Sequence, residues 1–275
     1  MHKKEENVMV VLDLNKPKES LLKTVKFASD FAFRANKDLV IWYNEKNSGR
    51  WRDLIEIKFS ICNEYPIDVR ISREKHNFLK NTYQNIIEKE NVKFVIVSKD
   101  YYISGRKKII PINVKTFTDN IISLISSVSV PVIIAPENEN IAIKKIITPV
   151  DRTGKVQKYS FVIMLLGLYE GAKLRLFVQN SKNEFDKDKI ATYLRHANKY
   201  LTESLVEYDL IYAKNKSEFS HHLLRFAFKK SDMIVLETNS ATSSKLKKII
   251  GEVGINDDCV IVFVPTKMMG NISWK

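Results

Sequence analysis

The sequence predicts an α/β protein built from two similar domains, each with a doubly wound parallel sheet. The first observation is a strand–helix–strand pattern near the middle of the chain. An apolar run at Ile146–Val150 is followed by a segment of helical periodicity and then by a second apolar run at Leu174–Val178. Gly171 stands where the helix would end, as glycine often does. Parallel strands need such a helical crossover.

The second observation is that this pattern occurs twice. Near the N-terminus the apolar run Val8–Leu12 ends in Asp13, as Ile146–Val150 ends in Asp151. About half the chain separates the two aspartates, and later motifs repeat at nearly the same spacing. A repeat of this length indicates two homologous domains rather than a solenoid. We place them at residues 1–139 and 140–275, with the polar stretch 137–140 at the junction.

The remaining elements of the first half follow from apolar periodicity. Ile67, Val69 and Ile71 alternate with polar residues, which indicates a strand at or near a sheet edge. Phe94–Val97 is continuously apolar, which is typical of a buried parallel strand. The predicted order after the first strand is a helix over 20–36, a strand at 39–43, a helix over 51–63, a strand at 67–71, a helix over 76–90, a strand at 94–97, a helix over 117–127 and a strand at 132–135.

The second half repeats this order. Met233–Leu236 corresponds to Phe94–Val97, and the run Lys247–Ile250 repeats Lys107–Ile110. After the strand–helix–strand pattern described above, we predict a helix over 185–204, a strand within 205–213, a helix over 218–230, a strand at 233–236 and a last strand at 259–264.

The composition indicates the compartment of the protein and the partners that it suits. There are two cysteines and no apolar leader in the first residues, so we expect a cytoplasmic protein without a disulfide framework or a membrane anchor. The net charge of +13 suits anionic partners, but the basic residues are dispersed. Two short basic runs, Arg106–Lys108 and Lys245–Lys248, carry few aromatic neighbours. We therefore expect weak, non-specific nucleic-acid binding at most.

The residues that usually carry catalysis or hold metals are not arranged for either role. The five histidines form no cluster with metal-ligand spacing, and no nucleophile elbow is present. The segment 51–63 has helical spacing at Leu54, Ile55, Lys58, Phe59 and Cys62, which places Cys62 on the apolar face of the predicted helix. We interpret Cys62, like Cys259 at the start of a strand, as a small core residue. A non-enzymatic protein is expected.

At this point the residues resemble a known family. Strands of the type VVLDLN and ITPVDRT, a fourth strand VIVS and a last strand PVIIAP are similar to those of universal stress proteins. The resemblance covers nearly the whole chain as two tandem copies. It implies a flavodoxin-like, five-stranded parallel sheet of order 3-2-1-4-5 in each copy. It also implies that the two copies pair as an intramolecular pseudo-dimer, and a homodimer is an alternative.

One branch of the family binds ATP, and its fingerprint G-x2-G-x9-G-[ST] follows the fourth strand. Glycines there let backbone N–H groups approach the phosphates. The resemblance also implies that Asp13 and Asp151 face the adenosine; turn or N-cap carboxylates are the alternative. The fingerprint is degraded in both halves. Its positions fall on Ser98, Tyr101, Pro111 and Ile112 in the first, and on Glu237, Ser240, Gly251 and Glu252 in the second, where the third position comes one residue late.

These observations predict a binding or regulatory protein of universal-stress type that does not bind ATP in the family's manner. The candidate ligand-binding residues are Asp13, Asp151, Ser240 and Gly251, with no catalytic residue, no metal and no resident cofactor. Two alternatives stay open. One is a stress sensor that binds ATP or an adenine nucleotide through the second domain, with slow hydrolysis. The other is a weakly nucleic-acid-associated protein. The physiological partner, a protein or a small molecule, is not predicted.

Overall fold

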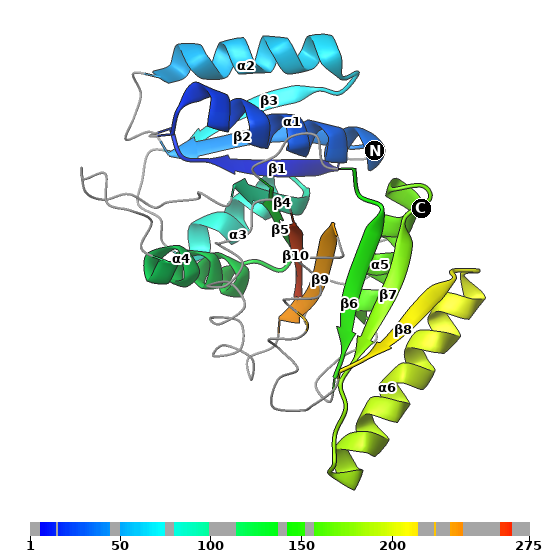
Figure 1. The fold of residues 1–275 in the computed structure, drawn as a ribbon. Helices are drawn as coiled ribbons and strands as arrows, with labels where there is room; N and C mark the ends of the chain where they lie inside the picture. Colours follow the sequence, from blue (N-terminus) through cyan, green and yellow to red (C-terminus); the bar gives the residue numbers. More distant parts are fainter. Residues whose placement is uncertain are drawn as a thin grey trace. The chain divides into compact units, whose positions relative to one another are not determined.

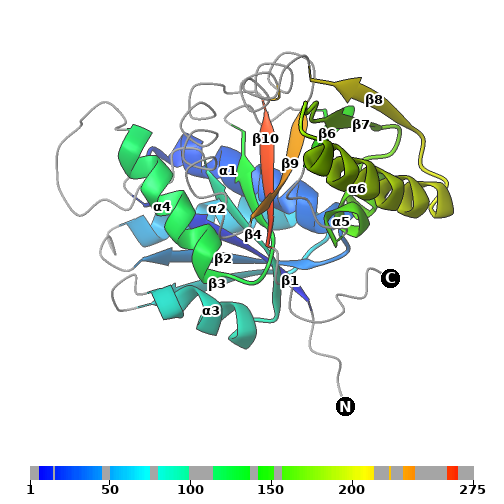
Figure 2. The ribbon, with the colours of Figure 1, turned by 90° about the horizontal axis from the view of Figure 1, so that it is seen from below.

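The computed structural model describes residues 6–14, 16–44, 50–74, 80–98, 114–136, 142–151, 157–213, 223, 232–238 and 259–265. The chain divides into two compact units, Met1–Asn140 and Ile141–Lys275. Each unit is an α/β structure with its own parallel sheet (Figures 1 and 2).

The sheet of the first unit has the order β3-β2-β1-β4-β5, and all its strand pairs are parallel. Helices α1 and α2 contact each other beside the sheet, and so do α3 and α4 (Figure 1). In chain order the elements are β1 (Asn7–Leu12), α1 (Lys18–Arg34), β2 (Asp38–Asn44), α2 (Trp51–Glu64), β3 (Val69–Glu74), α3 (Lys80–Lys89), β4 (Val92–Ser98), α4 (Val114–Ser127) and β5 (Val132–Ala135).

The core of this unit lies around β1 and β4, whose apolar residues are covered on both faces. Phe31 of α1 meets Phe94 of β4 edge to face, with ring centroids 5.1 Å apart. Neither ring is exposed to solvent. This explains why both strands read as continuous apolar runs, as expected for central parallel strands. The more polar β3 lies at the edge of the sheet, as its alternating pattern predicts.

The sheet of the second unit has the order β10-β9-β6-β7-β8. Counted within the unit, this is again 3-2-1-4-5, and its pairs are also parallel. The predicted fold class is therefore confirmed in both halves. The elements are β6 (Lys145–Val150), α5 (Gln157–Leu168), β7 (Lys173–Val178), α6 (Glu184–Glu203), β8 (Tyr208–Tyr212), β9 (Met233–Thr238) and β10 (Val260–Pro265).

Gly171 follows α5 with a φ of 78°. Glycine adopts this left-handed conformation without strain, so it ends the helix as the sequence predicts. In the first unit Asn36 has the same role after α1, with a φ of 52°. Asparagine is among the few other residues that tolerate this region.

One predicted helix face is wrong. The buried residues of α2 are Leu54, Ile57 and Ile61, so the helix is rotated relative to the expectation. Cys62 is exposed and is not a core residue, whereas Cys259 is buried as expected. The error arose because α2 has apolar residues on two sides, and periodicity alone does not say which side meets the sheet.

Among the described helices, none is both long and apolar enough to cross a membrane. The residues that the structure describes contain no group of three or more His, Cys, Asp or Glu side chains that could hold a metal ion.

Candidate functional site

In an open parallel sheet, ligands bind beyond the carboxyl ends of the strands, where the strand order reverses. Here that position lies between β1 and β4 in the first unit and between β6 and β9 in the second. Asp13 directly follows β1, and Asp151 directly follows β6. Both predicted aspartates therefore stand at the topologically expected place.

Asp13 is partly exposed and belongs to a turn. Its carbonyl oxygen accepts a hydrogen bond from the backbone N–H of Lys16, at 3.1 Å. It is not the N-cap of α1, because that position is Pro17 and no side chain caps the helix there. The N-cap interpretation is thus wrong for the first unit, and the turn interpretation agrees with the structure.

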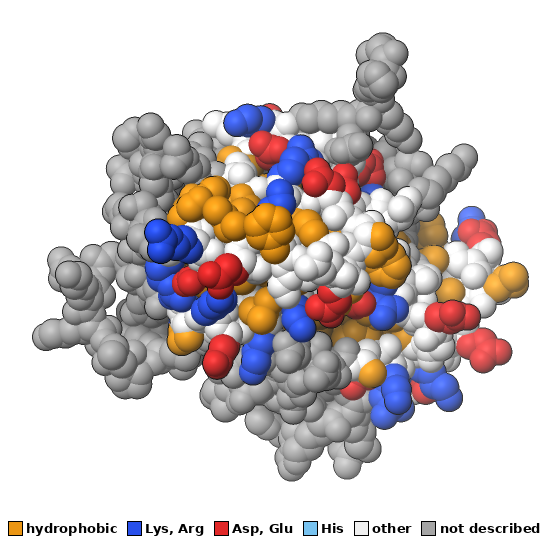
Figure 3. Space-filling view, turned by 90° about the horizontal axis from the view of Figure 1, so that it is seen from above, with side chains coloured by type: hydrophobic (Ala, Val, Ile, Leu, Met, Phe, Trp, Pro, Cys, Tyr) orange, Lys and Arg blue, Asp and Glu red, His pale blue; other side chains and the backbone are white. Residues whose placement is uncertain are grey.

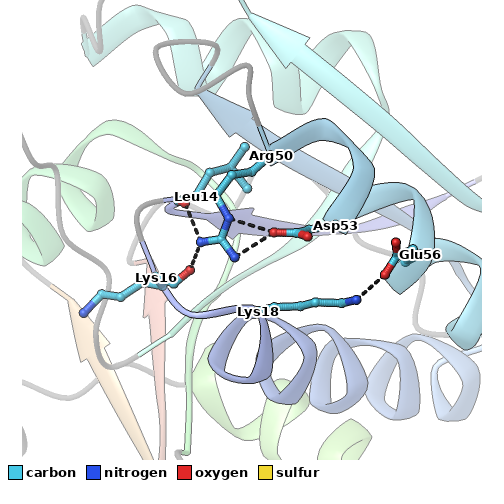
Figure 4. Close-up of polar contacts among 6 residues, drawn as sticks. All are labelled: Leu14, Lys16, Lys18, Arg50, Asp53 and Glu56. Atoms are coloured by element: carbon cyan, nitrogen blue, oxygen red, sulfur yellow. Dashed lines mark hydrogen bonds and ion pairs between the residues drawn. The ribbon is translucent and has the colours of Figure 1, made fainter.

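The loop that follows Asp13 is held by Arg50, which immediately precedes α2 (Figure 4). Its guanidinium donates to the carbonyl oxygen of Leu14 at 3.0 Å and also to that of Lys16. The same group pairs with the Asp53 carboxylate, whose Oδ2 lies 2.7 Å from Nε. Nearby, Lys18 of α1 pairs with Glu56 of α2 (Figure 4).

Arg50 was not predicted from the sequence, since it stands next to a polar loop with no motif around it. Its planar fork satisfies two backbone carbonyls and one carboxylate at once. The β1–α1 loop of this unit is therefore fixed by protein groups. A guanidinium used in this way is engaged within the protein rather than directed at a ligand phosphate.

The phosphate side of the first unit begins at Ser98, the last residue of β4, which is partly buried. The other fingerprint positions, Tyr101, Pro111 and Ile112, lie outside the described residues. The basic run Arg106–Lys108 also lies outside them.

The second unit places a buried cation beside its switch point. Lys158, in the first turn of α5, is 2 % exposed, and its ammonium donates to the carbonyl oxygen of Pro149 in β6. Its ammonium also lies 5.4 Å from the ring centroid of Tyr159. Asp151, two residues beyond Pro149, is 7 % exposed. Burial of a lysine is rare without compensating polar partners, so these contacts position Lys158 at the end of β6.

Pro149 also changes the pairing of the central strands. The β6–β9 ladder joins Ile146 to Met233 and Ile147 to Ile234. Proline has no N–H to continue it. The Thr148 hydroxyl instead donates to the carbonyl oxygen of Val235, at 3.0 Å. In the first unit the β1–β4 ladder continues to Val11, the residue just before Leu12 and Asp13.

Glu237 adds a second carboxylate at this end of the sheet. It lies in β9 opposite Val264 of β10 and is partly buried. Burial raises the pKa of the Tyr159 phenol, and the negative charges of Asp151 and Glu237 raise it further. Both carboxylates thus act on one buried phenol at the switch point. The sequence alone identified Glu237 as a fingerprint departure but gave no sign of Lys158 or Tyr159.

The remaining predicted site residues, Ser240 and Gly251, lie outside the described residues. So do Glu252 and the basic run Lys245–Lys248. The described part of the site in the second unit therefore combines two carboxylates, one ammonium and one phenol around the carboxyl ends of β6 and β9. Such a set can accept hydrogen bonds from a neutral or cationic ligand. It disfavours a polyanion, because like charges repel.

The fold was compared with known proteins. No protein-family model matches the sequence, and no curated protein matches it. Solved structures do match. A universal stress protein from Archaeoglobus fulgidus DSM 4304 has a TM-score of 0.61 and 10% identity, with 94% of this chain and 96% of the other covered.

Two Pseudomonas aeruginosa structures are similar over the same length. A "putative universal stress protein" from strain UCBPP-PA14 has a TM-score of 0.66 and 13% identity over 95% of this chain and 93% of its own. A functionally unknown protein from strain PAO1 has a TM-score of 0.64 and 13% identity, with 95% and 92% covered.

The two five-stranded sheets and these matches define the fold of the chain. The chain has the tandem fold of universal stress proteins, and the similarity extends over both units. The resemblance stated from the sequence is confirmed at this level.

Proposed function

We propose that this protein is a non-catalytic binding or regulatory protein of universal-stress type, and that it does not bind ATP in the family's manner. The observation that carries the proposal is the position of Glu237. Glu237 is the last residue but one of β9, where a phosphate loop would begin. Its negative charge and that of Asp151 add to the effect of burial in raising the pKa of the Tyr159 phenol.

A triphosphate placed at the carboxyl end of β9 meets the carboxylate of Glu237. Two like charges about 4 Å apart repel by roughly 4 kcal/mol at an effective dielectric constant of about 20. Lys158 offsets part of this repulsion, but its ammonium is already bonded to the Pro149 carbonyl. Side chains in place of the fingerprint glycines also hinder the close approach of backbone N–H groups to the phosphates.

The first unit supports the same conclusion by a different route. The Arg50 guanidinium donates its hydrogen bonds to Leu14, Lys16 and Asp53, so internal contacts hold the loop after β1 in place. The sequence at the phosphate positions offers Tyr101 and Pro111 in place of glycines. Proline has no N–H, and tyrosine is bulkier than the glycine that a close approach of phosphate needs.

A second candidate function, adenine-nucleotide sensing through the second unit, has one observation in its favour. Asp151 is buried at the end of β6, where the resemblance places the adenosine-side carboxylate. Titration calorimetry separates the two candidates. Adenosine binding without ATP binding agrees with a site limited by Glu237, whereas micromolar ATP binding favours the sensor. Mass spectrometry of the denatured purified protein would identify any co-purified ligand.

A further inference from the structure

Helix α2 presents a second apolar face that does not meet the sheet. Trp51, Ile55, Phe59 and Cys62 follow one another at spacings of four, four and three residues, so they share one side of the helix. We call this set the α2 stripe. Trp51 is 41 % exposed and Phe59 is 64 % exposed. Figure 3 looks onto this side of the first unit, where hydrophobic side chains lie among charged ones.

The α2 stripe is not merely the outer part of the core. The sheet-facing residues of α2 are Leu54, Ile57 and Ile61. Trp51 is held in place by ring contact with the buried Tyr43, at 6.2 Å between centroids. One end of the stripe is therefore a preordered aromatic, a residue type that carries much of the binding energy in protein interfaces.

The acidic and basic side chains of α2 differ in their contacts. Its acidic residues are used internally: Asp53 pairs with Arg50, Glu56 with Lys18 and Glu64 with Lys26. The basic residues Arg52 and Lys58 flank the stripe on its two sides. Within the part of the chain that the structure describes, neither of them makes an ion pair.

The corresponding helix of the second unit lacks this arrangement. α6 also follows the second strand of its sheet, but its exposed positions are mostly charged or polar, as at Lys187, Asp188, Arg195 and Lys199. Its exposed Phe185 is covered on one side by Lys189, whose ammonium lies 4.3 Å from the ring centroid. The stripe is thus a property of one copy and not a requirement of the repeated fold.

We propose that the α2 stripe is a docking site for an acidic amphipathic helix of another protein. The stripe spans about 11 residues, or roughly 16 Å of helix, which matches an apolar ridge of three turns on a partner helix. Glutamates or aspartates beside that ridge would meet Arg52 and Lys58. A second copy of this chain is disfavoured, because two stripes placed face to face bring their cations together.

The experiment uses the full chain and a synthetic helical peptide of about 15 residues, with leucines at i, i+4, i+7 and i+11 and glutamates on both flanks. Fluorescence anisotropy of the labelled peptide should show saturable micromolar binding that weakens with added salt. Phe59→Ser should weaken it at least about tenfold. The matched control, Phe185→Ser on α6, should leave it unchanged.

A charge exchange tests whether the partner of the α2 stripe is acidic. Arg52→Glu combined with Lys58→Glu should lose binding to the glutamate peptide and bind instead a peptide whose flanks are lysines. Circular dichroism confirms that the variants are folded. No binding up to about 1 mM peptide, or equal binding by Phe59→Ser, overturns the proposal. It is also overturned if Phe59→Ser instead abolishes binding to phosphatidylserine vesicles or self-association seen by ultracentrifugation.

Discussion

The guanidinium of Arg50 donates to the carbonyl oxygen of Leu14 at 3.0 Å and so joins the start of α2 to the loop after β1. This bond, with those to Lys16 and Asp53, fixes the loop that borders the expected ligand position of the first unit. Replacement of Arg50 by Ala leaves two carbonyls without this donor. We expect a loss of about 1–3 kcal/mol in the free energy of unfolding, measured by urea denaturation.

A matched control is Lys187→Ala. The Lys187–Glu184 pair is exposed, with side chains 50% and 80% accessible, so its removal should change stability by less than about 0.5 kcal/mol. If the two variants lose the same stability, Arg50 does not hold the loop in the way described.

Two phenylalanines of the first unit should respond very differently to truncation. Phe94 is fully buried against Phe31, and Phe94→Ala should cost about 3–5 kcal/mol because it opens a cavity in the core. Phe59 is 64 % exposed, and Phe59→Ala should cost no more than about 0.5 kcal/mol. Chemical denaturation of both variants measures this, and similar losses would contradict the assigned core.

The raised pKa of Tyr159 predicts a loss of stability at alkaline pH. The phenol stays neutral in the folded protein to a higher pH than in the unfolded chain. Above about pH 10 the unfolded chain therefore holds fewer protons, and stability falls by about 1.4 kcal/mol per pH unit for this group. Tyr159→Phe should remove that part of the decline.

The measurement compares urea denaturation of the wild type and Tyr159→Phe at about pH 7, 9 and 11. The difference between the two proteins should stay constant from pH 7 to 9 and then shift in favour of the variant. A constant difference up to pH 11 would mean that the phenol is not held neutral by burial and by Asp151 and Glu237.

The net charge of +13 predicts retention on DNA at low salt. Few clustered contacts mean that this binding should disappear by about 150 mM salt and show no sequence preference. Replacement of Lys245, Lys247 and Lys248 together by Gln should weaken it equally for all sequences in filter binding. Submicromolar affinity at that salt would instead favour a nucleic-acid-associated protein.

The fold could be predicted almost entirely from the sequence, because buried parallel strands such as Phe94–Val97 read as apolar runs and the whole pattern occurs twice. The rotation of α2 could not, since apolar residues lie on both its inner face and the α2 stripe. The expectation that the two units pair with each other stays a prediction.

The site was predictable only in part. Asp13 and Asp151 were found because they end the first strand of each sheet. Lys158 could not be predicted, because a lysine in the first turn of a helix normally faces water. Its burial depends on the hydrogen bond to the carbonyl oxygen of Pro149 in β6. Arg50 could not be predicted for a similar reason. Two of its partners belong to the loop after β1, and the third lies in the first turn of α2.

The most direct test of the account is a calorimetric titration of the wild-type protein and of Glu237→Gly with magnesium-ATP. We predict no binding by the wild type up to about 1 mM, and a gain of at least about tenfold in ATP affinity for Glu237→Gly, because the variant removes a carboxylate from the phosphate position. Micromolar binding of ATP by the wild type, unchanged in Glu237→Gly, would contradict the account.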